Sequence, residues 1–300
     1  EEKHTDVIQQ IVAGCNRVVN EASPIVDARL AGGSRVNIVM KPVALNGPIV
    51  TIRRFPEKPI TMEYLMRYGS ISPEAARFLE RLVKAKYNIF VSGGTGSGKT
   101  TFLNVLSQYI SPEERVITIE DSAELQLQDL PNLVSLETRN GNAEGCREIT
   151  IRELIRPSLR MRPYRIITGD VRGAEAIDML QCMNTGHDGS MSTGHANSAR
   201  DMLFRLENMV LMGMELPLQA VRQQIASGVD VIVHLGRLRD RSRKVLEIVE
   251  VTGCREGDIC LNTLYAYEET GEDGQGNIVG RLQERGQLRN EEKLKAAGLS

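Results

Sequence analysis

The sequence predicts an α/β fold: a largely parallel sheet covered by helices on both faces, preceded by a small α+β unit. From Ser72 onward, helical and strand-like patterns alternate, which is typical of such a sheet. Before that point, short β-type runs are separated by two turn signals, Gly32-Gly33 and Asn46-Gly47-Pro48. The 300 residues, 41% of them hydrophobic, suffice for one large or two medium domains with a buried core.

The N-terminal α+β domain is expected over residues 1–55. Apolar residues between Ile8 and Val19 recur at helical spacing and predict an amphipathic helix over residues 6–20. The runs PIVDARL, SRVNIVMK and PIVTIRRF then predict three strands. Residues 56–75 hold three prolines around a short helical stretch, so they are expected to form a linker or hinge.

The main domain is expected over residues 76–270, followed by a tail over residues 271–300. Strands are expected at YNIFVSG, RVITIED, NLVSLET, RIITGD, GSMSTGHA, DVIVHL, KVLEIVEV and ICLNTLYAY. Helices are expected over residues 73–86, 99–110, 151–159, 174–184, 198–212 and 216–227. The tail is rich in glycine and charge, and only NEEKLKAAG near its end has a helical pattern.

Composition narrows the class of protein. The 37 basic and 39 acidic residues nearly cancel, so net charge favours neither nucleic acid nor anionic lipid as a partner. Five widely spaced cysteines are typical of a reducing compartment rather than a disulfide framework. No run approaches the ~18 apolar residues of a membrane span, and no secretory signal opens the chain. We therefore expect a cytoplasmic protein and, since the sequence does not begin with methionine, a fragment that has lost N-terminal sequence.

The run GGTGSGKT over residues 93–100 fits the phosphate-binding pattern G-x-x-x-x-G-K-[ST]. An apolar strand precedes it and an amphipathic helix follows, so its backbone N–H groups can cradle a polyphosphate at a helix N-terminus. We expect Lys99 to reach the β- and γ-phosphates of ATP and the hydroxyl of Thr100 to bind Mg²⁺. A merely flexible glycine loop would weaken the fold without structural benefit. The expected nucleotide-binding residues are Gly93, Gly94, Thr95, Gly96, Ser97, Gly98, Lys99, Thr100 and Thr101.

Acidic residues end two of the expected strands. ITIED ends on Glu120 and Asp121, with Glu124 one helical turn further on, and RIITGD ends on Asp170. Because ligands of parallel sheets bind beyond the carboxyl ends of the strands, these acids should converge on the phosphate-binding loop. There they could hold Mg²⁺ and polarise the attacking water. The alternative for Asp170 is that it caps the helix that begins near Gly173.

Two of the four histidines, His187 and His195, lie in the run NTGHDGSMSTGHANS. Beside a phosphate site they are expected to sense the γ-phosphate or to position the strand between them. The alternative is a pair of half-buried imidazoles whose hydrogen bonds are satisfied within the protein.

Arginines could supply positive charge to the phosphoryl transition state, in part from a neighbouring subunit. Arg53 and Arg54 end a strand of the first unit, and Arg29 and Arg35 flank its turn. Arg139, Arg160 and Arg162 lie between the two acidic strands. For each of these arginines the alternative is a solvated surface position. The run RLRDRSRK over residues 237–244 is expected to be a solvated hairpin rather than a binding patch.

Several motifs, taken in order, resemble one family: the type II/type IV secretion and pilus ATPases, closest to the tight-adherence (CpaF/TadA-like) branch. The similar stretches are SPIVDARLAGGSRVN, TIRRF, GGTGSGKTT, TIEDSAEL, LRMRP, RIITGDVRG and NTGHDGSMSTGHANSARD. They cover the chain from about residue 7 to residue 270. A phosphate-binding loop alone would not distinguish this family from many other NTPases.

The resemblance implies a RecA-like P-loop NTPase domain behind the N-terminal domain, with ATP bound between the two. It further implies a hexameric ring at the cytoplasmic, inner face of the cell membrane, working with an inner-membrane platform protein. By this likeness, residues 93–101 are the Walker A loop, residues 120–124 the acidic Asp box, Asp170 the Walker B position and residues 187–195 the His box. Arg53, Arg54 and Arg139 match positions where the family carries arginines near the nucleotide.

One departure concerns Asp170, because the family normally has glutamate at this position. Aspartate is one methylene shorter, and a misplacement of ~1 Å can cost ~100-fold in rate. Glu120 or Glu124 could act as the base instead, and we expect Glu120 to work with Asp170. The sequence therefore leaves two main hypotheses, a Mg-ATP-hydrolysing motor for pilus assembly or secretion and a nucleotide-gated assembly protein with weak hydrolysis. A RecA-like nucleic-acid motor is disfavoured by the near-neutral charge.

Overall fold

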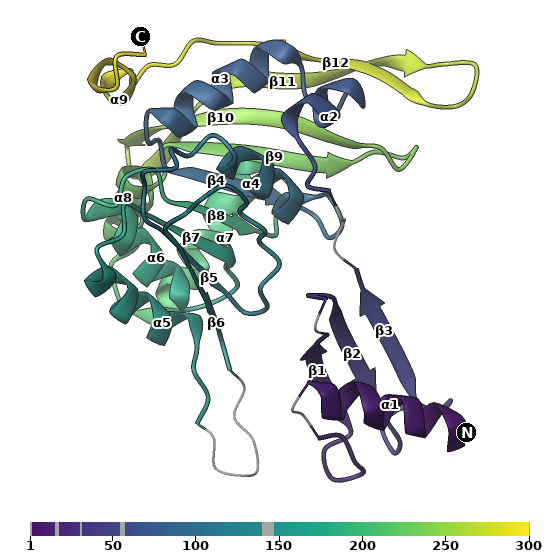
Figure 1. Ribbon diagram of the computed structural model, residues 1–300. Coiled ribbons are helices and arrows are strands. Elements are labelled where there is room, and N and C mark those ends of the chain that lie inside the picture. Colours follow the sequence, from purple (N-terminus) through teal and green to yellow (C-terminus); the bar gives the residue numbers. More distant parts are fainter. Residues whose placement is uncertain (1, 16–17, 31, 55–57, 140–146, 300) are drawn as a thin grey trace. The chain divides into compact units, whose positions relative to one another are not determined.

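The computed structural model describes residues 2–15, 18–30, 32–54, 58–139 and 147–299. The chain divides into two compact units, residues 1–59 and 60–300 (Figure 1). Each unit has its own hydrophobic core, and each is described by itself below.

The first unit packs helix α1 (Glu2–Gly14) against a three-stranded antiparallel sheet. The strands, in spatial order, are β1 (Ile25–Arg29), β2 (Arg35–Val39) and β3 (Ile49–Arg53). Ile8 and Val12 of the helix meet Val36 and Ile38 of the central strand in a small core. The helix was predicted over residues 6–20 but runs from Glu2 to Gly14. It ends early because glycine favours helix ends.

The second unit is built on a nine-stranded sheet, which confirms the predicted α/β fold. Its spatial order is β12-β11-β10-β9-β4-β8-β7-β5-β6, and the six strands from β9 to β6 run parallel. The parallel strands are β4 (Ile89–Gly93), β5 (Val116–Glu120), β6 (Leu133–Glu137), β7 (Arg165–Asp170), β8 (Met191–Gly194) and β9 (Val231–Arg237). The antiparallel extension consists of β10 (Arg243–Arg255), β11 (Asp258–Glu272) and β12 (Ile278–Glu284).

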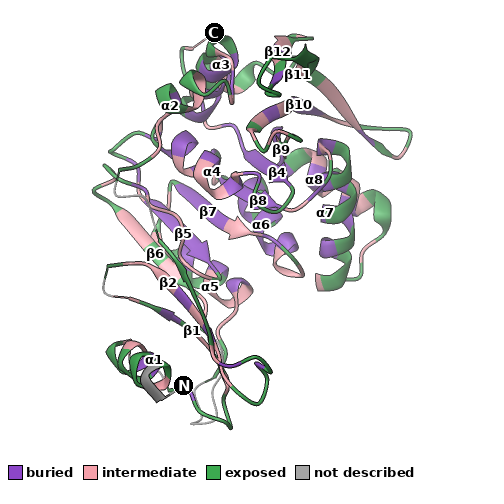
Figure 2. Cartoon of the chain, turned by 90° about the vertical axis from the view of Figure 1, so that its right-hand side faces the viewer, coloured by how far each residue is buried: buried purple, intermediate pink, exposed green. Residues whose placement is uncertain are grey.

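Helices cover both faces of this sheet, so its central strands are buried (Figure 2). In β4, Ile89 and Val91 pack into the core formed with α3 (Pro73–Lys84) and α4 (Lys99–Ser107). Phe90 packs on the opposite face. The helices of that opposite face are α6 (Glu175–Asn184), α7 (Ala199–Gly213) and α8 (Leu218–Gly228), with α5 (Ile151–Ser158) beside them over β5 and β7. None of the helices formed by the described residues has both the length and the apolar character of a membrane span.

Two segments at the margins of the expected main domain are part of the second unit. Helix α2 (Met62–Arg67) lies within the expected linker, yet Met62 and Ile71 are buried in the main core. Residues 55–57 of that linker lie outside the described residues. In the expected tail, β12 pairs with β11, and Leu294 of α9 (Glu292–Ala296) packs against the same core.

A buried ion pair fixes the start of β7. The guanidinium of Arg165 is fully buried and donates two hydrogen bonds, of 2.7 and 2.8 Å, to the carboxylate of Glu114. It also donates to the carbonyl of Val83 at 2.8 Å. A Cβ at position 189 would lie 2.6 Å from this guanidinium, so Gly189 makes room for it.

We predict that Arg165→Met lowers the free energy of unfolding by about 3–5 kcal/mol, because the buried Glu114 would keep only the more distant Lys86, at 3.9 Å, as an ion-pair partner. Urea unfolding followed by circular dichroism measures this change. Adding Glu114→Leu should recover most of the loss. The control is Arg239→Met, which removes an exposed ion pair with Glu269 and should cost less than about 1 kcal/mol. Equal losses in the two single variants would contradict the prediction.

Candidate functional site

The carboxyl ends of four neighbouring parallel strands, β4, β8, β7 and β5, bring the candidate catalytic residues together. Ser92 pairs with Gly194, and Asp170 pairs with Thr193, so the residues that end these strands are neighbours. We call Lys99, Glu120, Asp170, Thr193 and His195 the strand-end cluster. The clustering expected from a parallel sheet is therefore present in the structure.

The phosphate-binding loop directs several donors to one point. The carbonyl oxygen of Gly94 accepts hydrogen bonds from the N–H of Ser97 at 3.3 Å, the hydroxyl of Ser97 at 2.8 Å and the ammonium of Lys99 at 3.3 Å. Gly96 and Gly98 have φ values of 73° and 94°, which favour glycine. Gly98 precedes α4 without a side-chain cap, so the helix N-terminus can bind an anion. A phosphate oxygen would compete with the Gly94 carbonyl for these donors.

Lys99 links the loop to the histidine that follows β8. Its ammonium lies 3.4 Å from Nδ1 of His195 and is largely buried. Burial lowers the pKa of Lys99, and nearby Arg172 acts in the same direction, while Asp170 and Glu124 act against it. The ammonium is thus held in a partly desolvated position, where its attraction to a phosphate is strengthened.

Asp170 ends β7 and accepts hydrogen bonds from two residues of the neighbouring strand end. The hydroxyl of Thr193 donates at 2.5 Å and Nε2 of His195 donates at 2.8 Å. Burial acts to raise the pKa of Asp170, but the Thr193 hydrogen bond and the charge of Lys99 outweigh it, so the pKa is lowered. The helix-cap alternative does not describe this residue, because Ala174 is the N-cap of α6 without a side-chain cap, and the carboxylate of Asp170 bonds Thr193 and His195 instead.

Glu120 lies beside Asp170 in a different environment. Only 3% of it is exposed, and its carboxylate accepts the N–H groups of Glu124 and Leu125 at 3.0 Å. Burial raises the pKa of Glu120 to about 7, although these two N–H groups act to lower it. A Cβ at position 169 would lie 3.3 Å from Cγ of Glu120, so Gly169 makes room for Glu120 next to Asp170. A carboxylate with this pKa is suited to accept a proton near neutral pH.

The two histidines of the expected His box lie at opposite ends of β8. His195 follows the strand and joins the cluster, whereas His187 precedes it. The carbonyl of His187 accepts the hydroxyl of Ser190 at 2.7 Å. The structure therefore brings His195, but not His187, to the phosphate-binding loop.

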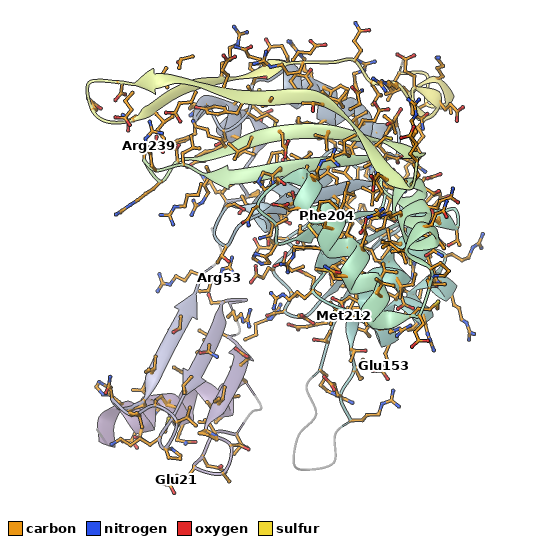
Figure 3. The ribbon with its side chains drawn as sticks, turned by 180° about the vertical axis from the view of Figure 1, so that it is seen from behind. Glu21, Arg53, Glu153, Phe204, Met212 and Arg239 are labelled. Carbon is orange, nitrogen blue, oxygen red and sulfur yellow. The ribbon has the colours of Figure 1, made fainter. Side chains whose placement is uncertain are left out.

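Of the predicted arginines, Arg139 follows β6 in the second unit, and Arg53 and Arg54 lie in the first unit. The guanidinium of Arg139 donates to the carbonyl of Arg147 at 3.1 Å. The backbone of Arg139 forms an isolated antiparallel bridge with Ile149. In the first unit, Arg53 ends β3 and Arg54 follows it (Figure 3).

In the first unit, cross-strand register places three arginines in a row on one face of the sheet. Arg29 is opposite Arg35, and Arg35 is opposite Arg53. Asp27 lies 3.5 Å from Arg35 and offsets part of the charge. The row concentrates positive charge at one end of the strands, which is suited to an anionic ligand.

Thr100 and Asp170 offer the ligands that Mg²⁺ prefers. Thr100 carries a hydroxyl in the first turn of α4, directly after Lys99, and the lowered pKa of Asp170 keeps its carboxylate ionised. Hydroxyl, carboxylate and phosphate oxygens together form a typical magnesium environment in proteins. The residues therefore fit the metal that the phosphate-binding motif implies.

Two contacts of the loop involve residues that sequence reasoning missed. Nδ1 of His234 lies 2.8 Å from the hydroxyl of Ser92, just before the loop. Nε of Arg243 donates to the carbonyl of Gly96 at 2.8 Å, although the run 237–244 was expected to be a solvated hairpin. No local pattern signals either contact, since both join residues more than 140 positions apart.

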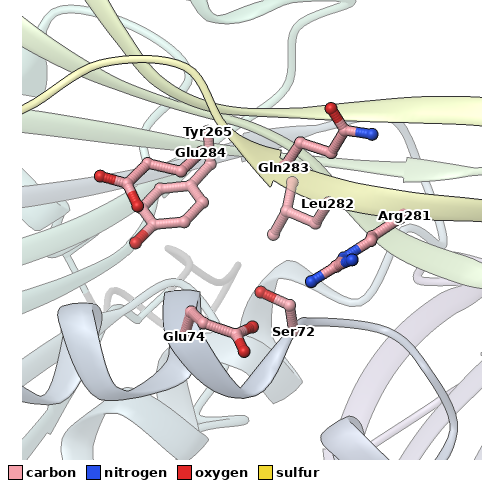
Figure 4. A pocket seen from close by; sticks show the side chains of 7 residues that line it. All are labelled: Ser72, Glu74, Tyr265, Arg281, Leu282, Gln283 and Glu284. Atoms are coloured by element: carbon pink, nitrogen blue, oxygen red, sulfur yellow. The ribbon is translucent and has the colours of Figure 1, made fainter.

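A separate pocket lies between the start of α3 and strands β11 and β12 (Figure 4). Its lining residues are Ser72, Glu74, Tyr265, Arg281, Leu282, Gln283 and Glu284. It contains no residue of the strand-end cluster or of the phosphate-binding loop. The pocket is therefore distinct from the candidate nucleotide site.

The sequence is similar to those of known secretion and conjugal transfer proteins. Residues 2–279 match the family described as "Type II/IV secretion system protein". The chain is 38% identical over 246 residues to a candidate conjugal transfer protein of Mycobacterium tuberculosis. The aligned region covers 80% of this chain and 69% of that protein. It is 35% identical over 263 residues to the type IV secretion system protein PtlH of Bordetella pertussis, covering 78% and 77% of the two chains.

A solved structure supports the same relationship. The VirB11 ATPase from the Brucella suis type IV secretion system is 31% identical, with a TM-score of 0.53 over 82% of this chain and 83% of that chain. The pilus retraction motor PilT is 17% identical, with a TM-score of 0.54 over 100% of this chain and 71% of that chain, and this likeness concerns the fold alone. These neighbours confirm the predicted RecA-like fold of the main domain.

The raised pKa of Glu120 predicts that stability depends on pH. Because the pKa is about 7 in the folded protein and 4.5 ordinarily, the folded state holds a proton that the unfolded chain releases in this range. Stability present below the ordinary pKa is therefore lost as the pH rises through about 7. We expect the free energy of unfolding to fall by about 2–3 kcal/mol between about pH 5 and about pH 8, relative to Glu120→Gln.

Urea unfolding of both proteins at a series of pH values measures this difference. The control is Glu113→Gln, which removes an exposed carboxylate and should show no such dependence on pH relative to the wild type. A difference between wild type and Glu120→Gln that stays constant with pH would contradict the prediction.

Proposed function

Since this chain belongs to the Type II/IV secretion system protein family, we propose that it is a Mg-ATP-hydrolysing motor that powers pilus assembly or protein secretion. The chain is an ATPase of this family and is similar to the VirB11 ATPase of the Brucella suis type IV secretion system. The observation that carries the proposal is the strand-end cluster, in which Lys99 and His195 join the phosphate-binding loop to Asp170.

Four residues have distinct roles in the proposed reaction, three from the strand-end cluster and Thr100 from the phosphate-binding loop. Lys99 binds the β- and γ-phosphates and neutralises charge that develops during transfer. Glu120 accepts the proton of the attacking water, because its pKa is about 7. Asp170 stays ionised and fixes the orientation of His195. Thr100 and Asp170 would hold Mg²⁺, which would supply positive charge to stabilise the phosphate groups.

The hydrogen bonds of Asp170 bear on the alternative of a nucleotide-gated assembly protein with weak hydrolysis. Its two carboxylate oxygens are already hydrogen-bonded to Thr193 and His195, which suits a residue that orients others. Glu120 supplies a second carboxylate with a suitable pKa. The shorter side chain at position 170 is therefore compatible with full turnover, with Glu120 as the base.

The proposal extends to assembly. We propose a homo-oligomer, a hexameric ring, in which arginines such as Arg53, Arg54 and Arg139 complete the nucleotide site from the same or a neighbouring subunit. The ring would act at the cytoplasmic, inner face of the cell membrane, together with an inner-membrane platform protein. From the resemblance of its motifs taken in order, we propose that the chain belongs to the tight-adherence branch. The near-neutral charge supports a protein rather than a nucleic-acid substrate.

We predict that Lys99→Ala lowers the rate of ATP hydrolysis by at least about 100-fold, because it removes a charged donor from the transferred phosphate. Release of inorganic phosphate from Mg-ATP measures the rate. The control is Lys84→Ala, which removes an exposed ammonium paired with Glu80 and should leave the rate unchanged. Equal turnover by Lys99→Ala and the wild type would overturn the proposed function.

Two substitutions separate the motor from the nucleotide-gated alternative. We predict that Glu120→Gln lowers turnover by about 100-fold or more, because it removes the base. Asp170→Glu should not raise turnover, because the base lies elsewhere and the longer side chain would displace the hydrogen bonds to Thr193 and His195. The alternative expects Asp170→Glu to raise turnover sharply, and that result in steady-state assays would favour it over a motor based on Glu120.

A further inference from the structure

Arg243, the first residue of β10, lies against the phosphate-binding loop. Its Nε donates a hydrogen bond to the carbonyl of Gly96 at 2.8 Å. Its Cδ lies 3.5 Å from the position that a Cβ on Gly98 would occupy. The arginine stem thus covers the outer side of the loop, and its positive charge lies beside a site for an anion.

The hydrogen bond to Gly96 determines the direction of the next N–H group. In a trans peptide, the carbonyl and the following N–H point in opposite directions. Because Arg243 holds the carbonyl of Gly96, the N–H of Ser97 points away from the arginine. It donates to the carbonyl of Gly94, the same oxygen to which the ammonium of Lys99 points. Arg243 therefore directs the Ser97 N–H to the side of the loop where a phosphate would bind.

Arg243 can perform this role because the start of β10 is held on two sides. Arg243 pairs with Arg237 of β9. The ammonium of Lys244 donates to the carbonyls of Tyr68 and Gly69 at 3.3 and 2.9 Å, and the N–H of Val245 donates to the carbonyl of Ser70 at 2.8 Å. Groups that orient a binding site act best when they are carried by a rigid element.

We propose that Arg243 is a positioning residue of the nucleotide site, which orients the Gly96–Ser97 peptide to bind the polyphosphate of ATP or ADP. This inference rests on the proposed nucleotide-binding function and adds a residue from outside the phosphate-binding motif. The Ser97 N–H would donate to the phosphates both in the bound state and in the transition state. Loss of Arg243 is therefore expected to weaken nucleotide binding more than it slows the chemical step.

The test compares Arg243→Gln, Arg243→Lys and the control Arg237→Gln in the full chain. Arg237 is exposed, lies opposite Arg243 in the β9–β10 ladder and carries the same charge. We expect Arg243→Gln to raise the Kd for fluorescent ADP and the KM for ATP about 10-fold, with kcat changed by less than about 3-fold. Arg243→Lys should recover part of the affinity, because an ammonium can still donate to the carbonyl. Arg237→Gln should bind as the wild type does.

Several outcomes would overturn the inference. They are equal affinities of Arg243→Gln and Arg237→Gln, equal losses in Arg243→Gln and Arg243→Lys, or a lowered melting temperature with unchanged Kd, which would indicate a structural role only. If Lys99→Ala still abolishes hydrolysis in these cases, the proposed function stands and only the role of Arg243 fails. Absence of nucleotide binding by the wild type would instead overturn the proposed function, and this inference with it.

Discussion

The two hydrogen bonds accepted by Asp170 determine the geometry of the whole candidate site. They join the end of β7 to Thr193 and His195 at the end of β8. His195 in turn contacts Lys99, at the start of the helix that follows β4. One carboxylate thus ties three strand ends together. This arrangement is possible only because β4, β8 and β7 are neighbours that run in the same direction.

The adjacent acids Asp170 and Glu120 have pKa values that are shifted in opposite directions. Asp170 has a lowered pKa because a hydroxyl and an ammonium stabilise its charge despite burial. Glu120 has a raised pKa because burial outweighs the two backbone N–H groups that it accepts. Such a separation of pKa values is how two carboxyl groups at one site take different roles. Gly169 permits it, since a side chain there would crowd Glu120.

The sequence predicted those parts of the site that local patterns encode. The phosphate-binding loop is a contiguous motif, and the acids follow β-type runs whose parallel arrangement brings their ends together. His187 and His195 are close in sequence, but a strand lies between them and carries them to opposite ends of the sheet. A linker was predicted over residues 56–75 because this stretch contains three prolines. The packing of Met62 and Ile71 into the main core depends on residues far away in the sequence, so the local pattern does not show it. Strand β12 likewise depends on its pairing with β11 rather than on its own pattern.

The contacts with the phosphate-binding loop that were not predicted both come from the antiparallel pair of strands β9 and β10. His234 bonds Ser92 before the phosphate-binding loop, and Arg243 bonds Gly96 within it. Between these two contacts, a Cβ at position 93 would lie 2.5 Å from the carbonyl oxygen of Leu235. The first glycine of the motif is therefore required by the neighbouring strand as well as by the phosphate. Strands β9 and β10 thus pack against the phosphate-binding loop, and the conformation of the loop depends on long-range contacts that its own motif does not encode.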